Sequence, residues 1–347
     1  MKLKFLLVAI TAFFFSMVLG AVTYYYVQPT IAQKIEQKEN EDKKQQELTE
    51  NAQQYYFTGW KDKPRKRALA VIIDNAVEAR PQAGLENADV VVEFPVEGGL
   101  TRFIAVISQD DLDLIGPVRS ARSYFVDVAE EYKAILVHAG GSEDSLELIA
   151  TRKQDHLDEI NGGVQVAGAF WRTPDRLKPH NLYTSSDTLR RVVKNLQLEA
   201  KNITPQRKLL AEGEEVKGEA VQNIYLVYPE KSSLVRFTYD QEKGVFARYI
   251  TNEGIPHVNT VGEQLLAANV IVQYTDFHIQ DGDGRLQIIL QGEGDALIFR
   301  AGTVVKGRWQ KAPGGLTKFT DEAGKEVPLL EGPTWIEVVP KGMRVHY

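Results

Sequence analysis

The sequence predicts an N-terminal transmembrane helix, then an α+β (or α/β) domain with a mixed sheet, then a mostly β domain. Three observations lead to this fold class. An apolar run opens the chain, strands alternate with helices between residues 68 and 198, and short strands with Gly-rich turns follow from residue 224. Alternating strands and helices are typical of layered domains, and many short strands are typical of barrels or sandwiches.

The first element is the apolar run from Phe5 to Val27, which follows Lys2 and Lys4. A helix needs about 20 mostly apolar residues to cross a bilayer, and this run has that length. No further Lys or Arg occurs before Lys34. The positive-inside rule therefore places the N-terminus in the cytoplasm and the rest of the chain outside.

A cleaved signal peptide is the alternative, with Val18-Leu19-Gly20 as the cleavage site. The apolar core of a signal peptide is usually about 7 to 15 residues, which is shorter than this run. Both interpretations export the protein. We therefore expect a single-pass cell-membrane protein that contacts the cytoplasmic membrane through residues 5–27, with its C-terminal part extracytoplasmic.

Changes in composition predict the domain organisation. Residues 1–30 form the anchor, and residues 31–54 form a stalk rich in Gln, Glu, Lys and Asn, which cannot bury enough apolar surface to fold alone. The folded domains are predicted at 55–200 and 223–347. Residues 201–222 are charged and lack aromatic residues, so they are predicted to form a linker.

The first domain is predicted to contain a hairpin, two further strands and three helices. Gly98-Gly99 between two apolar strands indicates the hairpin, and Pro95 predicts that the first of these strands lies at an edge or a bulge. Ser185 or Ser186 is the expected N-cap of the last helix. The predicted strands span residues 68–74, 89–97, 101–109 and 134–138, and the helices span 124–132, 142–152 and 184–198.

The second domain is predicted to contain eight strands. They span residues 224–228, 235–239, 245–250, 270–274, 286–290, 296–300, 303–310 and 334–339. Asp281-Gly282-Asp283-Gly284 has the look of a calcium loop, but the residue twelve positions along is Gly292 rather than Glu. A tight turn is therefore predicted there.

The composition excludes several classes of protein. The chain has no cysteine, so it has no disulfide, no thiol nucleophile and no cysteine to carry a lipid. The formal net charge of −6 argues against nucleic acid as a partner, which usually needs a basic face. The six histidines are scattered without ligand spacing, so we expect neither a metal nor a cofactor.

Polar residues interrupt the apolar strands of the first domain or occupy its loops. Charges are rarely buried unless paired, so these residues either form a structural ion-pair network or line an open cleft. The planar guanidinium of arginine suits carboxylate and phosphate groups, and converging arginines therefore indicate an anion site. The candidate ligand-binding residues are Asp74, Asn75, Arg80, Glu93, Glu97, Arg102, Arg119, Arg122, Asp127, His138, Arg172, His180 and Asn181.

Catalytic interpretations have less support. Glu93 and Glu97 could serve as the acid and base of a glycan-cleaving enzyme, but Pro95 between them disturbs the strand register. Neighbouring arginines would also keep both carboxylates ionised, whereas the acid must hold a proton. Ser142 does not lie in a G-x-S-x-G turn, so its expected role is an N-cap and not a nucleophile.

A family resemblance rests on the same polar positions. The segments that carry it in the first domain are Val71-Ile72-Ile73-Asp74-Asn75, Ala79-Arg80-Pro81-Gln82, Val96-Glu97-Gly98-Gly99-Leu100-Thr101-Arg102-Phe103, Gly116-Pro117-Val118-Arg119-Ser120-Ala121-Arg122 with Tyr124-Phe125 and Asp127, His138-Ala139-Gly140-Gly141-Ser142, Phe170-Trp171-Arg172 and Pro179-His180-Asn181-Leu182-Tyr183. Through them, residues 68–184 resemble the YerB-like lipoproteins, a domain of unknown function found in Gram-positive bacteria.

The companion C-terminal module of that family resembles residues 224–340 less sharply, through Asn269-Val270-Ile271-Val272 and Gly307-Arg308-Trp309-Gln310-Lys311. The resemblance implies two modules and an extracytoplasmic location, and it supplies no reaction. Because this chain lacks a cysteine, the membrane helix would replace the lipid of such lipoproteins.

We therefore expect a cell-envelope protein that binds an anionic or glycan ligand in an arginine-lined cleft. One alternative is a cell-wall hydrolase or transferase that uses a carboxylate or a histidine. Another is a structural scaffold for envelope partner proteins. Cell-wall polymer and envelope proteins are the expected partners.

Overall fold

The computed structural model describes residues 66–109, 112–199, 207–211, 214–228, 234–250 and 254–347. Residues 53–347 belong to one compact unit. The predicted anchor and stalk, residues 1–30 and 31–54, lie outside the described residues. Within the described ranges, every helix is too short or too polar to span a bilayer.

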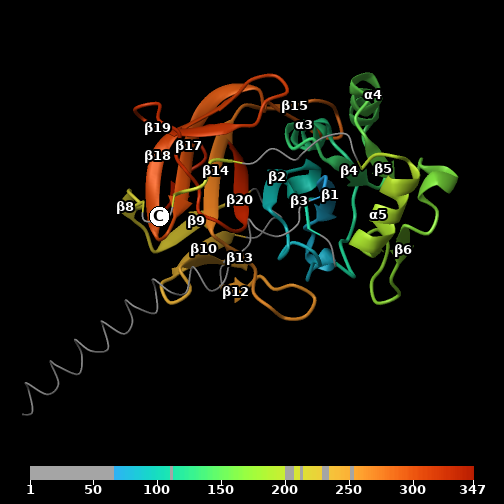
Figure 1. Cartoon of the computed structure of the whole chain (residues 1–347), viewed down its shortest axis with the longest axis horizontal. Coiled ribbons are helices and arrows are strands. Elements are labelled where there is room, and N and C mark those ends of the chain that lie inside the picture. The colour runs from blue at the N-terminus through green and yellow to red at the C-terminus, as the bar shows by residue number, and fades with distance from the viewer. Residues whose placement is uncertain (1–65, 110–111, 200–206, 212–213, 229–233, 251–253) are drawn as a thin grey trace, which may run out of the picture. The chain divides into compact units, whose positions relative to one another are not determined.

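A sheet of eleven strands runs through this unit, and both predicted domains contribute to it (Figure 1). The strand order is β19-β18-β17-β14-β20-β2-β3-β1-β4-β5, and β8 pairs with β18 outside this path. The N-terminal half supplies β1 (Leu69–Asp74), β2 (Val90–Pro95), β3 (Thr101–Ile107), β4 (Ile135–His138) and β5 (His156–Asp158). The C-terminal half supplies β8 (Glu219–Ala220), β14 (Asn269–Thr275), β17 (Gly292–Arg300), β18 (Thr303–Lys311), β19 (Lys318–Asp321) and β20 (Thr334–Pro340).

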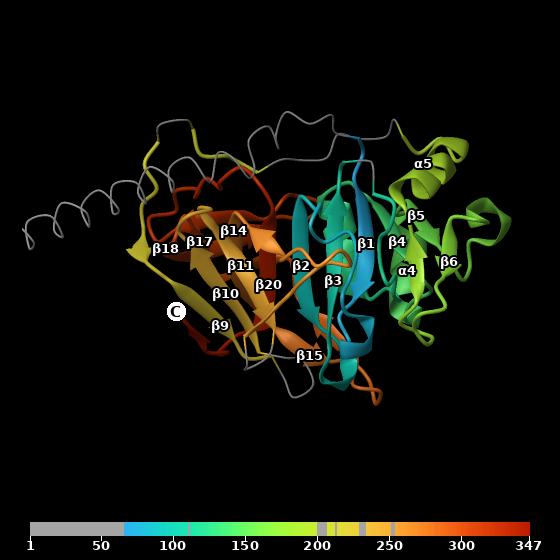
Figure 2. The same cartoon turned by 90° about the horizontal axis from the view of Figure 1, so that it is seen from below.

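The two halves join where β2 pairs with β20 in parallel, from Val90↔Thr334 to Glu93↔Glu337. Figure 2 shows the N-terminal strands β2 and β3 beside β20. The N-terminal half has the predicted mixed sheet with helices, and the C-terminal half is mostly β, as predicted. The shared sheet cannot be predicted from local patterns, because β2 and β20 are far apart in the chain.

Most strands at the centre of this sheet point the same way. β1 is parallel to β4, and β4 is parallel to β5, while β1 and β2 both pair antiparallel with β3. The carboxyl ends of β1, β2, β4 and β5 therefore lie at one edge, which we call the carboxyl edge. In open sheets of α/β proteins, ligands bind outside this edge.

Helices cover both faces of the N-terminal strands. On one face, α3 (Ser123–Glu131) and α4 (Glu143–Arg152) cover a core that includes Ala70 and Ile72. On the other face, α5 (Ser186–Asn195) packs against Val71 and Ile73. This division follows from the pleat, since successive side chains of a strand point to opposite faces. The described residues of this half also contain three short 3₁₀ helices, namely η2 (Val77–Ala79), η3 (Glu97–Gly99) and η4 (Gly163–Val166).

The two predicted N-caps differ. Ser185 caps α5, because its hydroxyl accepts a hydrogen bond from the Thr188 N–H in a capping box. Ser142 occupies the N-cap position of α4, but its side chain makes no cap hydrogen bond, and its buried hydroxyl has no partner in the described structure. Ser142 is therefore the N-cap residue of α4, as predicted, although its side chain makes no capping hydrogen bond.

A second sheet has the order β12-β11-β10-β9-β21, with β13 paired to β11. Its strands are β9 (Asn223–Leu226), β10 (Val235–Asp240), β11 (Val245–Ile250), β12 (Ile255–Pro256), β13 (Leu266–Ala267) and β21 (Val345–His346). Phe237 of β10 meets Trp335 of β20 with ring centroids 5.9 Å apart, and both belong to one core with α5. The two sheets therefore pack face to face, in the manner of a sandwich.

Two short hairpins complete the described strands. They are β6 (Phe170–Arg172) with β7 (Leu182–Thr184), and β15 (Phe277–Ile279) with β16 (Leu286–Ile288). Between β15 and β16, Asp281 accepts hydrogen bonds from the N–H groups of Asp283 and Arg285. The predicted tight turn is confirmed there.

The predicted hairpin at Gly98-Gly99 is also confirmed, since both glycines have positive φ and connect β2 to β3. The predicted edge position of its first strand is wrong, because β2 lies between β20 and β3. Pro95 is tolerated there because the pairing with β20 ends two residues earlier, at Glu93. The missing N–H of Pro95 therefore costs no bond to that neighbour.

Candidate functional site

Six of the predicted ligand-binding residues meet at the carboxyl edge. Asp74 ends β1 and lies opposite Arg102 of β3. The Arg119 N–H donates to the carbonyl of Ile72, so the segment that carries Arg119 and Arg122 is held against β1. We call this group the edge cluster, and its members are Asp74, Glu97, Arg102, Arg119, Arg122 and His180.

Glu97 organises one half of the edge cluster. Its carboxylate accepts hydrogen bonds from Nε and Nη2 of Arg122 and, at 3.4 Å, from Nη2 of Arg102. Burial acts to raise the pKa of Glu97, but the Arg122 hydrogen bonds and the two positive charges outweigh it and lower the pKa. Glu97 is therefore ionised at neutral pH and cannot serve as a general acid.

Asp74 organises the other half. Its Oδ2 lies 3.0 Å from Nε of Arg119 and 2.7 Å from Nδ1 of His180. A carboxylate oxygen accepts, so the Nδ1–H of His180 donates. The Asp74 Oδ1 accepts the N–H of Ala76, 3.1 Å away. Asp74 is thus fully engaged, while the side chains of Arg119 and His180 are each 20% exposed.

Arginine is in excess in the edge cluster, with three guanidinium groups against two carboxylates. Burial, and after it the positive charge of Arg122, lowers the pKa of Arg102 to about 10, and Glu97 only partly opposes this. The side chain of Glu97 is 24% exposed. The edge cluster is therefore partly open to solvent, and its arginines outnumber its carboxylates.

Asn75, Arg80 and Glu93 belong to a different network. The Asn75 amide donates to Glu93 Oε1 at 3.1 Å and accepts from Arg80 Nε at 3.1 Å. Glu93 forms an ion pair with Arg248 of β11, and both side chains are fully buried. The Glu93 carboxylate therefore faces the interior and not the carboxyl edge.

Arg248 has partners from both halves of the chain. It lies 4.8 Å from the ring centroid of Trp335, in cation–π geometry. Its Nη1 donates to Nδ1 of His257, 2.6 Å away, so the opposite ring nitrogen donates to Gln82. Burial, followed by the charges of Arg248 and Arg80, holds the pKa of His257 well below its usual range, so His257 is neutral.

A second carboxyl group, Glu337 of β20, lies beside Glu93. Its Oε2 accepts a hydrogen bond from the Tyr228 hydroxyl at 2.6 Å. Burial and the neighbouring Glu93 charge raise the pKa of Glu337 well above its usual range, so it holds a proton. We call Glu93, Tyr228, Arg248, His257 and Glu337 the buried junction.

The other four predicted residues lie apart. Asp127 pairs with Arg152 at 2.6 Å between α3 and α4. His138 is buried and stacks on His156, with Nε2 to Nδ1 at 3.0 Å. Arg172 donates to Asn181 at 3.0 Å in the β6–β7 hairpin. Ligand binding by the thirteen residues stays a prediction, and the structure brings six of them together.

Sequence reasoning missed Arg248 and Glu337, although a signal was present. Both interrupt apolar strands, in Val245-Phe246-Ala247-Arg248 and Trp335-Ile336-Glu337-Val338. The rule that selected Glu93 in the first domain would have selected them in the second. Within the described ranges, no group of three or more His, Asp or Glu side chains is placed to hold a metal ion.

The fold and the edge cluster define a two-domain protein built on one mixed sheet, with a polar group at the carboxyl edge. The family comparison gives its class. Residues 57–199 match the model "Protein of unknown function (DUF3048) N-terminal domain", and residues 224–336 match the model of the C-terminal domain of the same family. The chain belongs to this family, for which no activity is assigned.

YerB of Bacillus subtilis agrees with this assignment both in sequence and in structure. The chain is 31% identical over 280 residues to "Putative lipoprotein YerB" of Bacillus subtilis (strain 168), covering 79% of this chain and 82% of that protein. It is also similar to the crystal structure of the YerB protein from Bacillus subtilis. That match has a TM-score of 0.72 and 29% identity, over 82% of this chain and 94% of that chain. The predicted resemblance to YerB-like lipoproteins is confirmed.

Proposed function

We propose that this protein is held at the cytoplasmic membrane by residues 5–27 and binds an anionic group of the cell envelope at its carboxyl edge. The length of the apolar run and the lysines before it support the anchor. The relative named as a lipoprotein supports an extracytoplasmic location. With no cysteine in this chain, the apolar helix takes the place of a lipid.

One observation carries the binding proposal, namely the excess of arginine in the edge cluster. Arg102, Arg119 and Arg122 converge on two carboxylates, and the cluster is partly exposed. A phosphate or carboxylate group can accept paired hydrogen bonds from a guanidinium, so it would balance the remaining charge. A wall polymer that carries phosphodiester or carboxylate groups has this chemistry.

The same geometry gives little support to glycan hydrolysis. An acid and a base must both reach the scissile bond. Glu93 is fully buried against Arg248, and Glu97 is held ionised by Arg122 and Arg102. Neither carboxyl group of this pair is thus suited to donate a proton to a substrate.

The test uses the full-length protein in detergent micelles and purified sacculi of a Gram-positive bacterium. One portion of the sacculi keeps its phosphodiester polymers, and the other is stripped of them by acid. We expect cosedimentation with the intact sacculi, and a loss of affinity of about tenfold in Arg119→Gln, since a charged hydrogen bond contributes about 1.5–3 kcal/mol. High salt should also weaken retention.

The matched control is Arg308→Gln, which removes an exposed arginine that also pairs with two carboxylates, Glu293 and Asp295. Arg308→Gln should bind the intact sacculi with the same affinity as the unchanged protein. Equal retention of Arg119→Gln and the unchanged protein would contradict the proposal. Release of soluble sugar fragments, abolished by Glu97→Gln or His138→Ala, would support the enzymatic alternative instead.

A further inference from the structure

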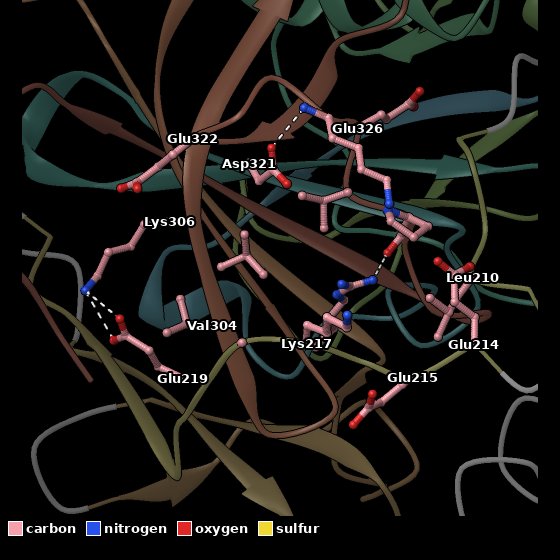
Figure 3. A pocket seen from close by; sticks show the side chains of 16 residues that line it. Leu210, Glu214, Glu215, Lys217, Glu219, Val304, Lys306, Asp321, Glu322 and Glu326 are labelled. Atoms are coloured by element: carbon pink, nitrogen blue, oxygen red, sulfur yellow. Dashed lines mark hydrogen bonds and ion pairs between the residues drawn. The ribbon is translucent and has the colours of Figure 1, made fainter.

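A cavity of about 630 Å³ lies in the C-terminal half, and none of its lining residues belongs to the edge cluster (Figure 3). Its walls come from Leu210 and residues 214–219, from β17 and β18, and from residues 321–328. Small-molecule sites usually measure about 300–1,000 Å³, so this cavity has room for a ligand of several to a few tens of atoms.

Arg300, the last residue of β17, is the notable member of the lining. It is 5% exposed, and its Nη1 donates to the carbonyl of Pro328. Its Nε is buried and has no hydrogen-bond partner in the described structure. Burial lowers the pKa of Arg300, and the negative charge of Glu214 only partly opposes this.

A comparison with the other buried arginines shows what is missing at Arg300. Each of the other four has a carboxylate within ion-pair distance, namely Arg67 with Asp155, Arg102 and Arg122 with Glu97, and Arg248 with Glu93. Arg300 makes no ion pair with any described residue. A buried cation without a counter-ion is costly, so the carboxylate or phosphate of a ligand would fit at this position.

The rim of the cavity carries more negative than positive charge, since it holds Asp321 and five glutamates but three lysines, Lys217, Lys306 and Lys325. Glu214, Glu215, Glu322 and Glu326 line it, as Figure 3 shows, and none of them forms an ion pair with a described residue. The fifth rim glutamate, Glu219, is paired with Lys306 at 3.2 Å. A purely anionic ligand would be repelled by these carboxylates, and a purely cationic one would leave Arg300 without a partner.

We propose that this cavity binds a small zwitterionic ligand of the amino-acid or short-peptide class. The ligand carboxylate pairs with Arg300, and its ammonium groups contact the rim glutamates. Leu210, Val304 and Val327 provide apolar walls for the carbon chain between the charges. The site is independent of the edge cluster and of the function proposed for it.

Isothermal titration calorimetry on the full-length protein in detergent micelles tests this proposal. The probe is the dipeptide lysyl-alanine, which carries one carboxylate and two ammonium groups. Its C-terminal amide removes the carboxylate, and its doubly N-acetylated form removes both ammonium groups. We expect lysyl-alanine to bind and each blocked form to bind at least about tenfold more weakly, because one charged hydrogen bond has that effect.

Substitutions at Arg300 and at the rim glutamates test which side chains contact the charged groups of the dipeptide. Arg300→Gln should weaken lysyl-alanine at least about tenfold and leave the affinity for the amide unchanged. If Arg300→Gln does not fold, the rim double variant Glu322→Gln/Glu326→Gln is used instead. It should also bind lysyl-alanine at least about tenfold more weakly. Arg308→Gln on β18 and Arg119→Gln in the edge cluster are controls that should bind lysyl-alanine normally.

Three results would overturn the proposal. They are no binding of lysyl-alanine to the folded protein, equal binding of the amide, or unchanged affinity in the folded Arg300 or rim variants. Because Arg119→Gln is measured in the same series, failure here is distinguishable from failure at the edge cluster. Loss of sacculus binding with normal dipeptide binding would concern the edge cluster alone.

Discussion

The buried junction and the edge cluster start from the same strand and end in opposite environments. Glu93 lies within β2 and Glu97 lies just beyond its end, and each forms an ion pair with arginine. The side chains of Glu93 and Arg248 are 0% exposed, whereas that of Glu97 is 24% exposed. The residue types are the same, so depth in the molecule separates the two groups.

Because they differ in burial, the buried junction and the edge cluster have different roles. A buried ion pair has lost its hydration, so it contributes to the choice of one packing arrangement and is costly to break. At the buried junction, Glu93 comes from the N-terminal half and Arg248 from the C-terminal half, so the pair joins the two. A partly exposed cluster contributes little to stability, but its charges remain available to a ligand.

The largest expected effect is at the buried junction. Arg248→Ala leaves Glu93 charged and buried without its main partner, and we expect it to lower the free energy of unfolding by about 3–5 kcal/mol. Chemical denaturation of the full-length protein in detergent measures this. Arg308→Ala, at an exposed arginine, is the control and should cost about 1 kcal/mol or less. A comparable small loss in Arg248→Ala would remove the distinction between the two regions.

The second prediction concerns the proton on Glu337. Its pKa in the folded protein is raised well above its usual 4.5 by burial and by Glu93. A group with a raised folded pKa stabilises the protein fully below the unfolded pKa, and this stability is lost as the pH rises from there toward the folded pKa. The loss can reach about 1.4 kcal/mol per pH unit in that window.

Glu337→Gln cannot titrate, and its amide can still donate to Glu93 and accept from Tyr228. The unfolding free energy of this variant, relative to the unchanged protein, should therefore increase between pH 5 and 7. Denaturation series at pH 5, 6 and 7 measure the difference. A constant difference across these pH values would show that Glu337 has no raised pKa.

The smallest expected effect on stability is at the edge cluster. Arg119→Gln removes a guanidinium that is 20% exposed, while Asp74 keeps His180 and the Ala76 N–H as partners. We expect a loss of about 1 kcal/mol or less in unfolding free energy, together with the tenfold loss of sacculus binding. If the variant were strongly destabilised but bound normally, the edge cluster would be structural, as the scaffold interpretation requires.

Much of the fold could be predicted from local patterns. The strand predicted at 134–138 is β4, and the helix predicted at 142–152 is α4, because short apolar runs and helix periodicity do not depend on distant residues. The edge cluster was also partly predictable. Asp74, Arg102 and Arg119 lie at strand ends or in the loops that follow, and strand ends in one sheet come together at its edges.

The assignment of partners could not be predicted in the same way. Glu93 and Glu97 differ by four positions and were equivalent candidates, yet one lies in the interior and the other at the edge. The reason is the pairing of β2 with β20, which covers Glu93 and ends before Glu97.

The sequence by itself therefore determined the apolar run at the N-terminus, the order of most strands and helices, and the polar residues that interrupt them. Only the tertiary structure decided which carboxylate meets which arginine and which of these pairs remains open to solvent. The physical reason is that burial of a charge depends on strands brought together from distant parts of the chain, as at Glu93, Arg248 and Glu337. Local sequence patterns do not contain that information.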